Sequence, residues 1–536
     1  MPLSQLRPGM QCTGLSVVRG TSIAQFDVEV LDVIGAQAGL SGPRILVRAS
    51  GPAVDATGIG PGFSGSPILC PDAGGVRRNA GAISESIGEY GNHVVLATPI
   101  EEMLRDPPAT PPATSSPRSR GLARSARPLA GALTVSGLSP RTLGLLTRAA
   151  RGTDTPVLAA PAGPLGGFPR QELAPGAAVA ATLASGDIAL GAVGTVAYRD
   201  GARIWAFGHS FEGLGRRSIF LEDAYVFSVI SNPIALPDFG AGSYKLTSAG
   251  GHVQGTVSSD AVASIAGTVG APPTGIPLRV VAREAGGDGR VVTLDSLLAD
   301  ERSLGFGAGL SLTAPLAASQ GLEQLLRSFG PATLTMCFRV KLAGRGRALG
   351  YCNPYFDAFT PLDDLIEAAS LVDAFDLPAP RIERATISIR ARPGVRSDVL
   401  ISARAPRRVV AGKRVRVRIT VQRRSGGRRT LNVPVRVPHG LRPGSRTLVL
   451  SGTGGGAGSA EESFLIEFAD EFSGAFGGSE EPRTLRELVR RIAALDQDAG
   501  ISARIRRGDE RLVYRSDEVS FEGRLRVRLK VRRARR

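Results

Sequence analysis

The chain has 536 residues, which is enough for two to four domains that each bury a core. Its 68 glycines and 37 prolines, with many short Val/Ile/Leu runs between turn signals, favour a mainly β protein. The formal net charge is +17, and no apolar run reaches the ~18 residues of a membrane-spanning helix, so no transmembrane segment is expected.

Residues 1–104 are predicted to form a compact β unit that carries a tight Gly/Ser turn. We expect its elements in this order: strands at 26–34 and 44–48, a hairpin at 81–87, a strand at 94–97 and a short helix at 99–104. Residues 105–128 are rich in Pro, Ala, Ser and Arg without periodicity, which predicts a linker or an exposed loop.

Residues 129–375 are predicted to form a second β block with short helices. A strand leads to a helix that begins with Ser139 as N-cap and Pro140 in the first turn. Further on, Arg-Asp-Gly at 199–201 is a strong hairpin signal. Short helices are expected at 322–329 and 362–373.

The last third of the chain changes character. Residues 381–452 alternate basic with apolar residues, which predicts an immunoglobulin-like β-sandwich with one face in water. Residues 460–536 are predicted to hold a helix from Thr484 to about Leu495 and further strands. The Gly-rich stretch at 451–460 has no helix-opening context for phosphate binding and is predicted to be a flexible loop.

The positive charge is concentrated in one segment. Residues 381–450 hold 19 basic and 2 acidic residues, so this segment alone carries +17. A patch of that density suits an anionic surface such as a wall polymer, a phospholipid or nucleic acid. The alternative is that the arginines are the solvated faces of strands. Nucleic acid is the least favoured partner, because the segment has almost no aromatic residues for base stacking.

Four cysteines are too few for a disulfide framework in a chain of this length. We expect that Cys337 and Cys352 can pair across a hairpin, whereas Cys12 and Cys70 are expected to be buried as small apolar residues. No His/Cys/Asp spacing resembles a zinc site. The first residues, 1–5, lack the basic and apolar regions of a signal peptide; taken literally, this indicates a cytoplasmic protein.

The Gly/Ser turn at 62–67 reads Gly-Phe-Ser-Gly-Ser-Pro and places Ser64 between glycines. Glycine lets the backbone approach a scissile carbonyl group, as a serine peptidase requires around its nucleophile. In the chymotrypsin-like arrangement, the N–H groups of the serine and of the residue two before it form the oxyanion hole. Here these donors are Ser64 and Gly62. The alternative is an ordinary turn with a capping serine.

Neighbouring motifs agree in content and order with one peptidase family. Around the serine turn lie Phe-Asp-Val-Glu-Val (26–30), Thr-Gly (57–58), Gly-Ala-Ile (81–83) and Thr-Pro-Ile-Glu-Glu-Met-Leu (98–104). A second block runs from Gly-Thr-Val (194–196) to Ala-Phe-Gly-His (206–209). Over about residues 5–105 and 180–280 the chain therefore resembles the SpoIVB-type (sporulation stage IV B) serine peptidase family. Because this resemblance begins near residue 7, an export signal upstream of the chain is the alternative to a cytoplasmic location.

The resemblance implies a trypsin-like double β-barrel core, narrow specificity, self-processing and His209 as the catalytic base. Two features depart from the family. Its founding members place the histidine block before the serine block, whereas here Ser64 comes first; a triad is defined by geometry, so this order does not prevent catalysis. The family's acidic position corresponds to Ser50, which leaves Asp55 and Asp223 as candidates for the third member.

A Ser-His enzyme must draw its base from the four histidines of the chain, which are His93, His209, His252 and His439. His209 follows a predicted strand directly after Gly208 and has aromatic neighbours, and the family resemblance implies it as the base. His93, at the start of a strand, is a rival, and the alternative for His209 is a loop histidine packed on those aromatic side chains.

These patterns predict a serine endopeptidase that cleaves protein substrates and needs no metal or organic cofactor. The alternative is a catalytically inactive peptidase-like scaffold whose basic segment binds an anionic envelope polymer or a partner protein. The serine at the family's acidic position favours this alternative.

Overall fold

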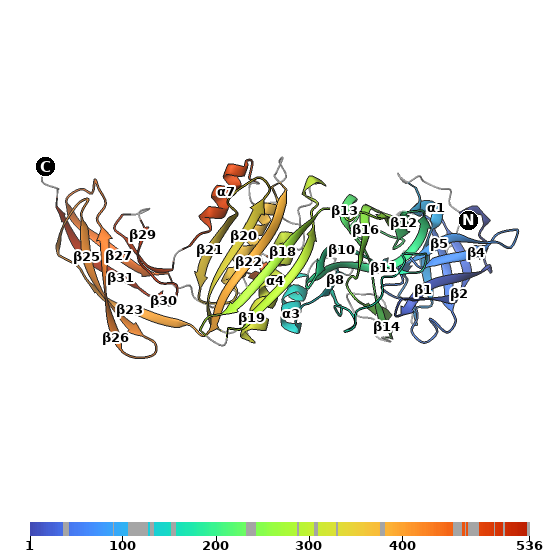
Figure 1. Cartoon of the computed structure of the whole chain (residues 1–536), viewed down its shortest axis with the longest axis horizontal. Coiled ribbons are helices and arrows are strands. Elements are labelled where there is room, and N and C mark those ends of the chain that lie inside the picture. The colour runs from blue at the N-terminus through green and yellow to red at the C-terminus, as the bar shows by residue number, and fades with distance from the viewer. Residues whose placement is uncertain are drawn as a thin grey trace. The chain divides into compact units, whose positions relative to one another are not determined.

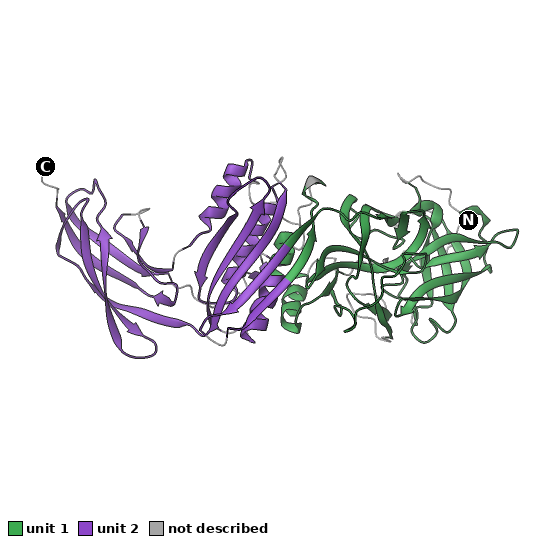
Figure 2. Cartoon of the chain, viewed as in Figure 1, with its two compact units in different colours: residues 1–277, 295–316, 469–477 green, residues 278–294, 317–468, 478–536 purple. Residues whose placement is uncertain are grey.

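The computed structural model describes a mainly β protein that divides into two compact units (Figures 1 and 2). Unit 1 comprises residues 1–277, 295–316 and 469–477, and unit 2 comprises residues 278–294, 317–468 and 478–536. The residues described are 1–35, 42–88, 91–105, 127–128, 133–151, 157–231, 243–286, 289–304, 309–327, 331–375, 381–453, 464–466, 468–469, 482–497, 499–506 and 510–532. Most of the predicted linker at 105–128 and of the predicted Gly-rich loop at 451–460 lies outside them.

The N-terminal part of unit 1 is a closed barrel of six antiparallel strands. The strands are β1 (Gln11–Arg19), β2 (Ser22–Ile34), β3 (Arg44–Ser50), β4 (Pro67–Pro71), β5 (Arg77–Ser86) and β6 (Val94–Pro99). Their order is β4-β1-β2-β3-β6-β5, and pairing of β5 with β4 closes the ring. Alternation along β2 buries Phe26, Val28 and Val30 in the barrel core. The short elements η1 (Leu3–Gln5), α1 (Ile100–Met103) and β7 (Arg127–Pro128) flank it.

A second closed barrel of six antiparallel strands follows in unit 1. Its strands are β10 (Ala178–Gly186), β11 (Ala189–Asp200), β12 (Arg203–Ala206), β13 (Gly215–Asp223), β16 (Val253–Ala261) and β17 (Ser264–Val269). The order is β10-β13-β16-β17-β12-β11, closed by β11 on β10. The predicted hairpin at 199–201 is confirmed, since Asp200 of β11 pairs with Arg203 of β12.

Smaller elements lie before, within and after the second barrel in the chain. They are β8 (Leu133–Ser136), α3 (Pro140–Ala149), β9 (Val157–Ala159), the hairpin β14 (Val226–Ser231) and β15 (Ser243–Thr247), β19 (Val291–Ala299) and η2 (Arg302–Leu304). The predicted cap of α3 is confirmed, because Thr142 N–H donates to Ser139 Oγ at 3.2 Å.

The two barrels contact each other through hydrogen bonds and apolar side chains. Thr195 N–H donates to Ser64 O at 2.8 Å, and Asn79 Nδ2 donates to Ala197 O at 2.8 Å. A buried cluster from both barrels comprises Ala82, Ile100, Met103, Ala197 and Trp205. The residues on either side of this junction are therefore held in fixed register.

Unit 2 contains a sheet with the order β21-β20-β22-β18. Its strands are β18 (Gly275–Glu284), β20 (Ala332–Leu342), β21 (Leu349–Tyr355) and β22 (Ile382–Pro393), and the helices nearby in sequence are α4 (Leu310–Leu326) and α5 (Thr360–Asp373). The boundary predicted at 381 is wrong for β22. This strand pairs in parallel with β18 and antiparallel with β20 rather than with the strands that follow it, so its apolar face is buried by the preceding sheet.

The basic C-terminal part forms two sheets over one core. One sheet has the order β26-β25-β23-β30 and the other β24-β31-β27-β28-β29. The strands are β23 (Arg396–Arg404), β24 (Arg408–Val410), β25 (Arg414–Arg423), β26 (Arg428–Arg436), β27 (Gly444–Gly452), β28 (Gly500–Arg504), β29 (Glu510–Arg515), β30 (Val519–Glu522) and β31 (Arg524–Arg532). Separation of 381–452 from 460–536 is therefore wrong, because β28–β31 complete these sheets; the helix α7 (Leu485–Ala494) lies between β27 and β28 in the chain.

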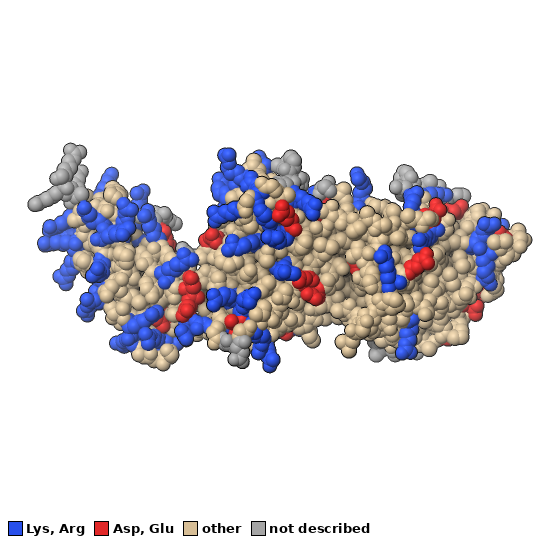
Figure 3. All heavy atoms as spheres, viewed as in Figure 1, with Lys and Arg blue, Asp and Glu red and all other residues tan. Residues whose placement is uncertain are grey.

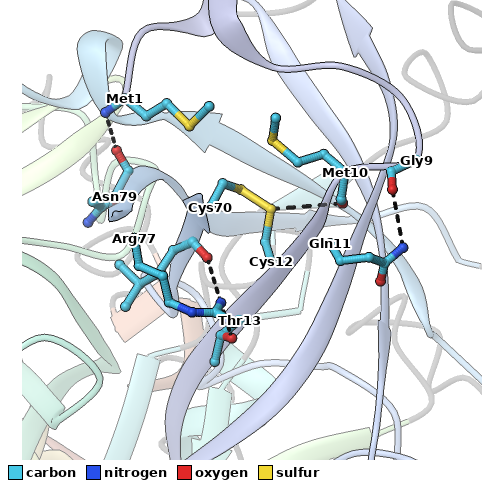
Figure 4. Close-up of a disulfide and its surroundings, with 10 residues drawn as sticks. Met1, Gly9, Met10, Gln11, Cys12, Thr13, Cys70, Arg77 and Asn79 are labelled. Carbon is cyan, nitrogen blue, oxygen red and sulfur yellow. Dashed lines mark hydrogen bonds between the residues drawn. A yellow bond between two sulfur atoms is a disulfide. The ribbon is translucent and has the colours of Figure 1, made fainter. Parts of the chain in front are cut away.

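Two disulfides pair all four cysteines. The pair Cys337–Cys352 joins directly opposite residues of β20 and β21, as expected for a hairpin. Cys12 and Cys70 are buried as expected, but they are not separate apolar residues, because they form a disulfide between β1 and β4 (Figure 4). Strand pairing brings their Cα atoms to 4.4 Å although 58 positions separate them in sequence. Local spacing carries no trace of this contact.

Candidate active site

Ser64 lies on the turn that connects β3 to β4 of the first barrel. Three backbone N–H groups of this turn donate hydrogen bonds. Phe63 N–H donates to Gly60 O at 3.0 Å and Ser66 N–H to Phe63 O at 2.9 Å within the turn, and Gly65 N–H donates to Ile83 O of β5 at 2.7 Å. These bonds fix the turn against β5. Ser64 is fully buried within it.

Two glycines of the turn are required by its shape. Gly62 and Gly65 have φ values of +93° and +90°, a region in which residues with a Cβ are strained. A Cβ on Gly65 would overlap Thr195 O and lie 2.6 Å from Phe207 N, while one on Gly62 would lie 2.8 Å from Lys245 Cβ. The glycines thus allow strands of the second barrel to approach the serine closely.

The two N–H groups predicted for the oxyanion hole are available. Within the described residues, neither Gly62 N–H nor Ser64 N–H donates a hydrogen bond, although both residues are buried. A buried N–H group without an acceptor is rare in folded proteins and costs free energy. Two such groups on one turn are suited to receive a carbonyl oxygen that becomes negatively charged.

His209 lies on the loop between β12 and β13 of the second barrel. Phe207 and Gly208 have φ values of +70° and +72°, so the chain turns sharply after β12. Thr98 Oγ1, at the end of β6, donates to Gly208 O at 2.6 Å. A Cβ on Gly208 would lie 3.1 Å from Ile83 O, the same carbonyl group that accepts from Gly65 N–H. The histidine loop and the serine turn therefore pack on the same part of β5.

The imidazole of His209 is held in one tautomer. Its Nδ1 is 2.6 Å from Ser210 O, and because a carbonyl oxygen only accepts, Nδ1 carries the proton and Nε2 keeps its lone pair. Nε2 and Ser64 Oγ are both buried, and neither has a hydrogen-bond partner within the described residues. Burial lowers the pKa of His209, an effect that the Ser210 carbonyl and the carboxylates of Glu85 and Asp260 oppose.

Within the described residues, no carboxylate forms a hydrogen bond with His209, so neither candidate for the third triad member fills that role. Asp55 is exposed and accepts from Gly51 N–H at 2.7 Å, where it closes its own loop. Asp223 is buried and lies 3.0 Å from Nδ1 of His252.

The two carboxylates whose charge reaches His209 are otherwise engaged, and sequence reasoning missed both. Glu85 accepts from Arg44 Nε at 2.6 Å. Asp260 accepts from the backbone N–H groups of residues 211, 212 and 213 at 2.6–2.8 Å and so fixes the loop that follows His209.

Lys245 is a further buried group at the serine turn that the sequence did not identify as functional. It lies on β15, where alternation places it on the same buried face as Ser243 and Thr247. Lys245 N–H donates to Pro61 O at 2.9 Å, so β15 runs along the turn that carries Ser64. Burial lowers the pKa of Lys245 to about 7. The signal available in the sequence was a lysine in phase with the buried positions of a short strand.

Within the described residues, no cluster of three or more His, Cys, Asp or Glu side chains is placed to hold a metal ion. Among the helices that the structure describes, none combines the length and apolarity needed to cross a membrane.

Comparison of the chain with protein-family models, curated proteins and solved structures finds no match.

Proposed function

We propose that the protein is a serine endopeptidase of the SpoIVB type with Ser64 as nucleophile and His209 as base. The observation that carries this proposal is the pair of buried, unpartnered atoms Ser64 Oγ and His209 Nε2, on loops that pack on the same carbonyl group of β5. Unsatisfied polar atoms are costly in a folded protein, and they gather where a ligand or reaction uses them.

The chemistry follows from these groups. Ser64 Oγ attacks the scissile carbonyl carbon while His209 Nε2 takes its proton, and the new oxyanion is bound by Gly62 N–H and Ser64 N–H. The C–N bond then breaks as His209 gives the proton to the leaving amine. Water, deprotonated by Nε2, hydrolyses the acyl-enzyme. Ser210 O orients Nδ1–H, the task that a carboxylate performs in a triad.

The fold supports the proposal of a trypsin-like core. Two closed six-stranded barrels lie in succession, the nucleophile comes from the first and the base from the second. Ser64 is fully buried and His209 is 4% exposed, so a peptide reaches the pair only after a local opening. We expect slow turnover of general substrates and cleavage of a narrow set of sequences, including sites in the chain itself.

Hydrolysis of a fluorogenic peptide library tests the assignment. Ser64→Ala and His209→Gln are expected to abolish hydrolysis while circular dichroism and unfolding midpoints stay near wild type. The matched control is His93→Gln, because His93 is half-buried just before β6 and was the rival base. Activity that survives Ser64→Ala, or that is lost only in His93→Gln, would refute the proposed pair.

A second candidate function, binding of an anionic envelope polymer, is favoured by the outer faces of the basic sheets. On β25 and β31 exposed basic residues alternate with core residues, and within the described part of the chain these form no ion pair: Arg414, Arg416, Arg418, Arg524, Arg526, Arg528 and Lys530. Figure 3 shows basic side chains gathered over this part of the chain. Alternate residues of a strand repeat every ~6.6–6.8 Å, which suits a polymer with regularly spaced charges. The fold of these sheets is proposed to be immunoglobulin-like.

Binding to a poly(glycerol phosphate) resin at several salt concentrations tests this candidate. Replacing Arg526 and Arg528 with Gln is expected to weaken binding and to flatten its dependence on salt, because fewer counterions are released. Replacing Arg7 and Arg19, two exposed arginines of unit 1, is the charge-matched control. Equal loss in both pairs of variants would contradict a specific role of the basic sheets.

A further inference from the structure

The ammonium group of Lys245 lies in an enclosure of hydroxyl groups behind the serine turn. Its Nζ donates to Ser16 Oγ at 2.7 Å and to Thr195 Oγ1 at 3.3 Å. It also lies 4.4 Å from the ring centroid of Phe63, the residue between the two oxyanion-hole donors. The side chain of Lys245 fills the space that a Cβ on Gly62 would need. This lysine therefore contacts both the backbone and the side chains of the turn.

A chain of hydroxyl groups connects Lys245 to the carbonyl group of Gly62. Ser66 Oγ donates to Ser16 Oγ at 2.9 Å, and Thr195 Oγ1 donates to Gly62 O at 3.0 Å. Gly62 O shares its peptide plane with Phe63 N–H, which donates to Gly60 O at 3.0 Å, so the peptide unit between the two oxyanion-hole donors is held at both ends. The network thus holds the turn in the shape that leaves the two N–H groups free.

No carboxylate balances this charge in the described residues. Nζ contacts Ser16 from β1, Phe63 from the turn and Thr195 from β11, and none of these side chains titrates near neutral pH. Burial is the one cause that lowers the pKa of Lys245 to about 7, with no contribution from a charged neighbour. A buried cation without a counter-ion is costly, and an anion that arrives nearby offsets that cost.

We propose that Lys245 is a positioning residue for catalysis, whose ammonium group holds the Gly62–Ser64 turn and electrostatically stabilises the oxyanion formed there. This role rests on the proposed peptidase function and adds a third functional group to Ser64 and His209. It also explains why a lysine occupies a site where an apolar side chain of similar size would cost less free energy to bury.

Thermodynamic linkage makes the role measurable. If the oxyanion and the ammonium group stabilise each other, an anionic tetrahedral adduct on Ser64 must raise the pKa of Lys245, and protonated Lys245 must raise the affinity for the adduct by the same factor. Because the free enzyme loses this proton above about pH 7, affinity for the adduct should fall between pH 6.5 and pH 8.5. A fall of about 25-fold follows if the adduct requires the protonated form.

The experiment measures binding of phenylboronic acid, which forms a tetrahedral anionic adduct with an activated serine, across this pH range. Wild type is compared with Lys245→Met, and Ser64→Ala is the control without an adduct. We expect the fall of about 25-fold to be present in wild type and absent in Lys245→Met. Identical pH dependence in the two proteins would overturn the role of Lys245 alone. Absence of an adduct in wild type at every pH would instead refute the serine site, and with it this role.

A measurement on the wild-type chain covers the case in which Lys245→Met does not fold. With ¹³C at the lysine Cε positions, titration by NMR gives the pKa of Lys245 with and without the boronate. A rise in this pKa on adduct formation supports the proposal. An unchanged pKa in a chain that has bound the boronate would overturn it.

Discussion

Removal of the Cys12–Cys70 disulfide is expected to destabilise the first barrel strongly. The bond joins β1 to β4, and the loop that it closes contains the whole serine turn. In Figure 4 it lies beside two further links between chain segments, from Met1 to Asn79 and from Arg77 to Thr13. The double variant Cys12→Ser/Cys70→Ser removes the cross-link and keeps side chains of similar size.

The expected magnitude follows from the length of the closed loop. For a sequence separation of 58, the chain-entropy relation gives a loss of about 14 cal/mol/K in the unfolded state, or about 4 kcal/mol at 25 °C. Loss of the bond returns this entropy to the unfolded chain. The Cys337–Cys352 bond closes a separation of 15 and is expected to contribute about 3 kcal/mol, but in unit 2.

Tryptophan fluorescence during urea unfolding is a selective assay, since Trp205 is the one tryptophan in the chain and lies in the cluster between the two barrels. The Cys12/Cys70 variant should shift the Trp205 transition to lower urea, and Cys337→Ser/Cys352→Ser should leave it in place. A Trp205 transition within about 1 kcal/mol of wild type in the first variant would refute the loop-closure argument. Equal shifts in both variants would show that Trp205 does not report on unit 1 alone.

Three further predictions concern the turn and its two titratable neighbours. Gly65→Ala should lower the free energy of unfolding by at least about 2 kcal/mol and abolish peptide hydrolysis. The control Gly75→Ala should lower it by only about 1 kcal/mol, because Gly75 has a φ of +80° but no atom within 4 Å of an added Cβ. Equal losses of stability in urea unfolding would contradict the steric argument. Because burial lowers the pKa of His209, hydrolysis should rise with pH through a midpoint below 6.5, and a midpoint above 6.5 would contradict His209 as the base. The pKa of Lys245 is about 7 in the folded state and near 10.4 in the unfolded state, so the unfolded state binds more protons between these pH values. The free energy of unfolding should therefore rise with pH in this range in wild type but not in Lys245→Met. Urea unfolding midpoints measured at several pH values would show the difference.

Local patterns predicted several single elements of unit 1. Apolar alternation marks β2, and Asp-Gly marks the turn between β11 and β12. The Ser139 cap marks the start of α3. These features depend on near neighbours in sequence, so one chain suffices to find them.

Long-range pairing escaped prediction for a physical reason. The partner of β22 is chosen by burial of its apolar face against β18 and β20, and the C-terminal sandwich is completed by β28–β31, which begin at Gly500 or later although β25 ends at Arg423. The Cys12–Cys70 bond depends on β1 lying beside β4. Such contacts leave no periodic trace in the sequence.

The candidate site likewise contains some groups that local sequence patterns indicate and others that long-range contacts bring in. The glycines of the serine turn and of the Gly-His motif indicate backbone conformations with positive φ, so Ser64 and His209 could be selected from the sequence. The groups around Ser64 and His209 could not be selected from the sequence. Lys245 reaches the turn from a strand about 180 residues away, and the loop after His209 is held by Asp260 from another strand. The partner of His209 Nδ1 is a backbone carbonyl group, which every sequence contains and none reveals.

The most direct test of the central claim is labelling of the intact chain with a fluorophosphonate probe, which reacts with a serine that a base has activated. Wild type should be labelled on Ser64, as located by mass spectrometry of the tryptic peptide. Labelling should disappear in Ser64→Ala and in His209→Gln and persist in His93→Gln. A folded wild-type protein that takes up no label, or takes it up on another serine, would contradict the account.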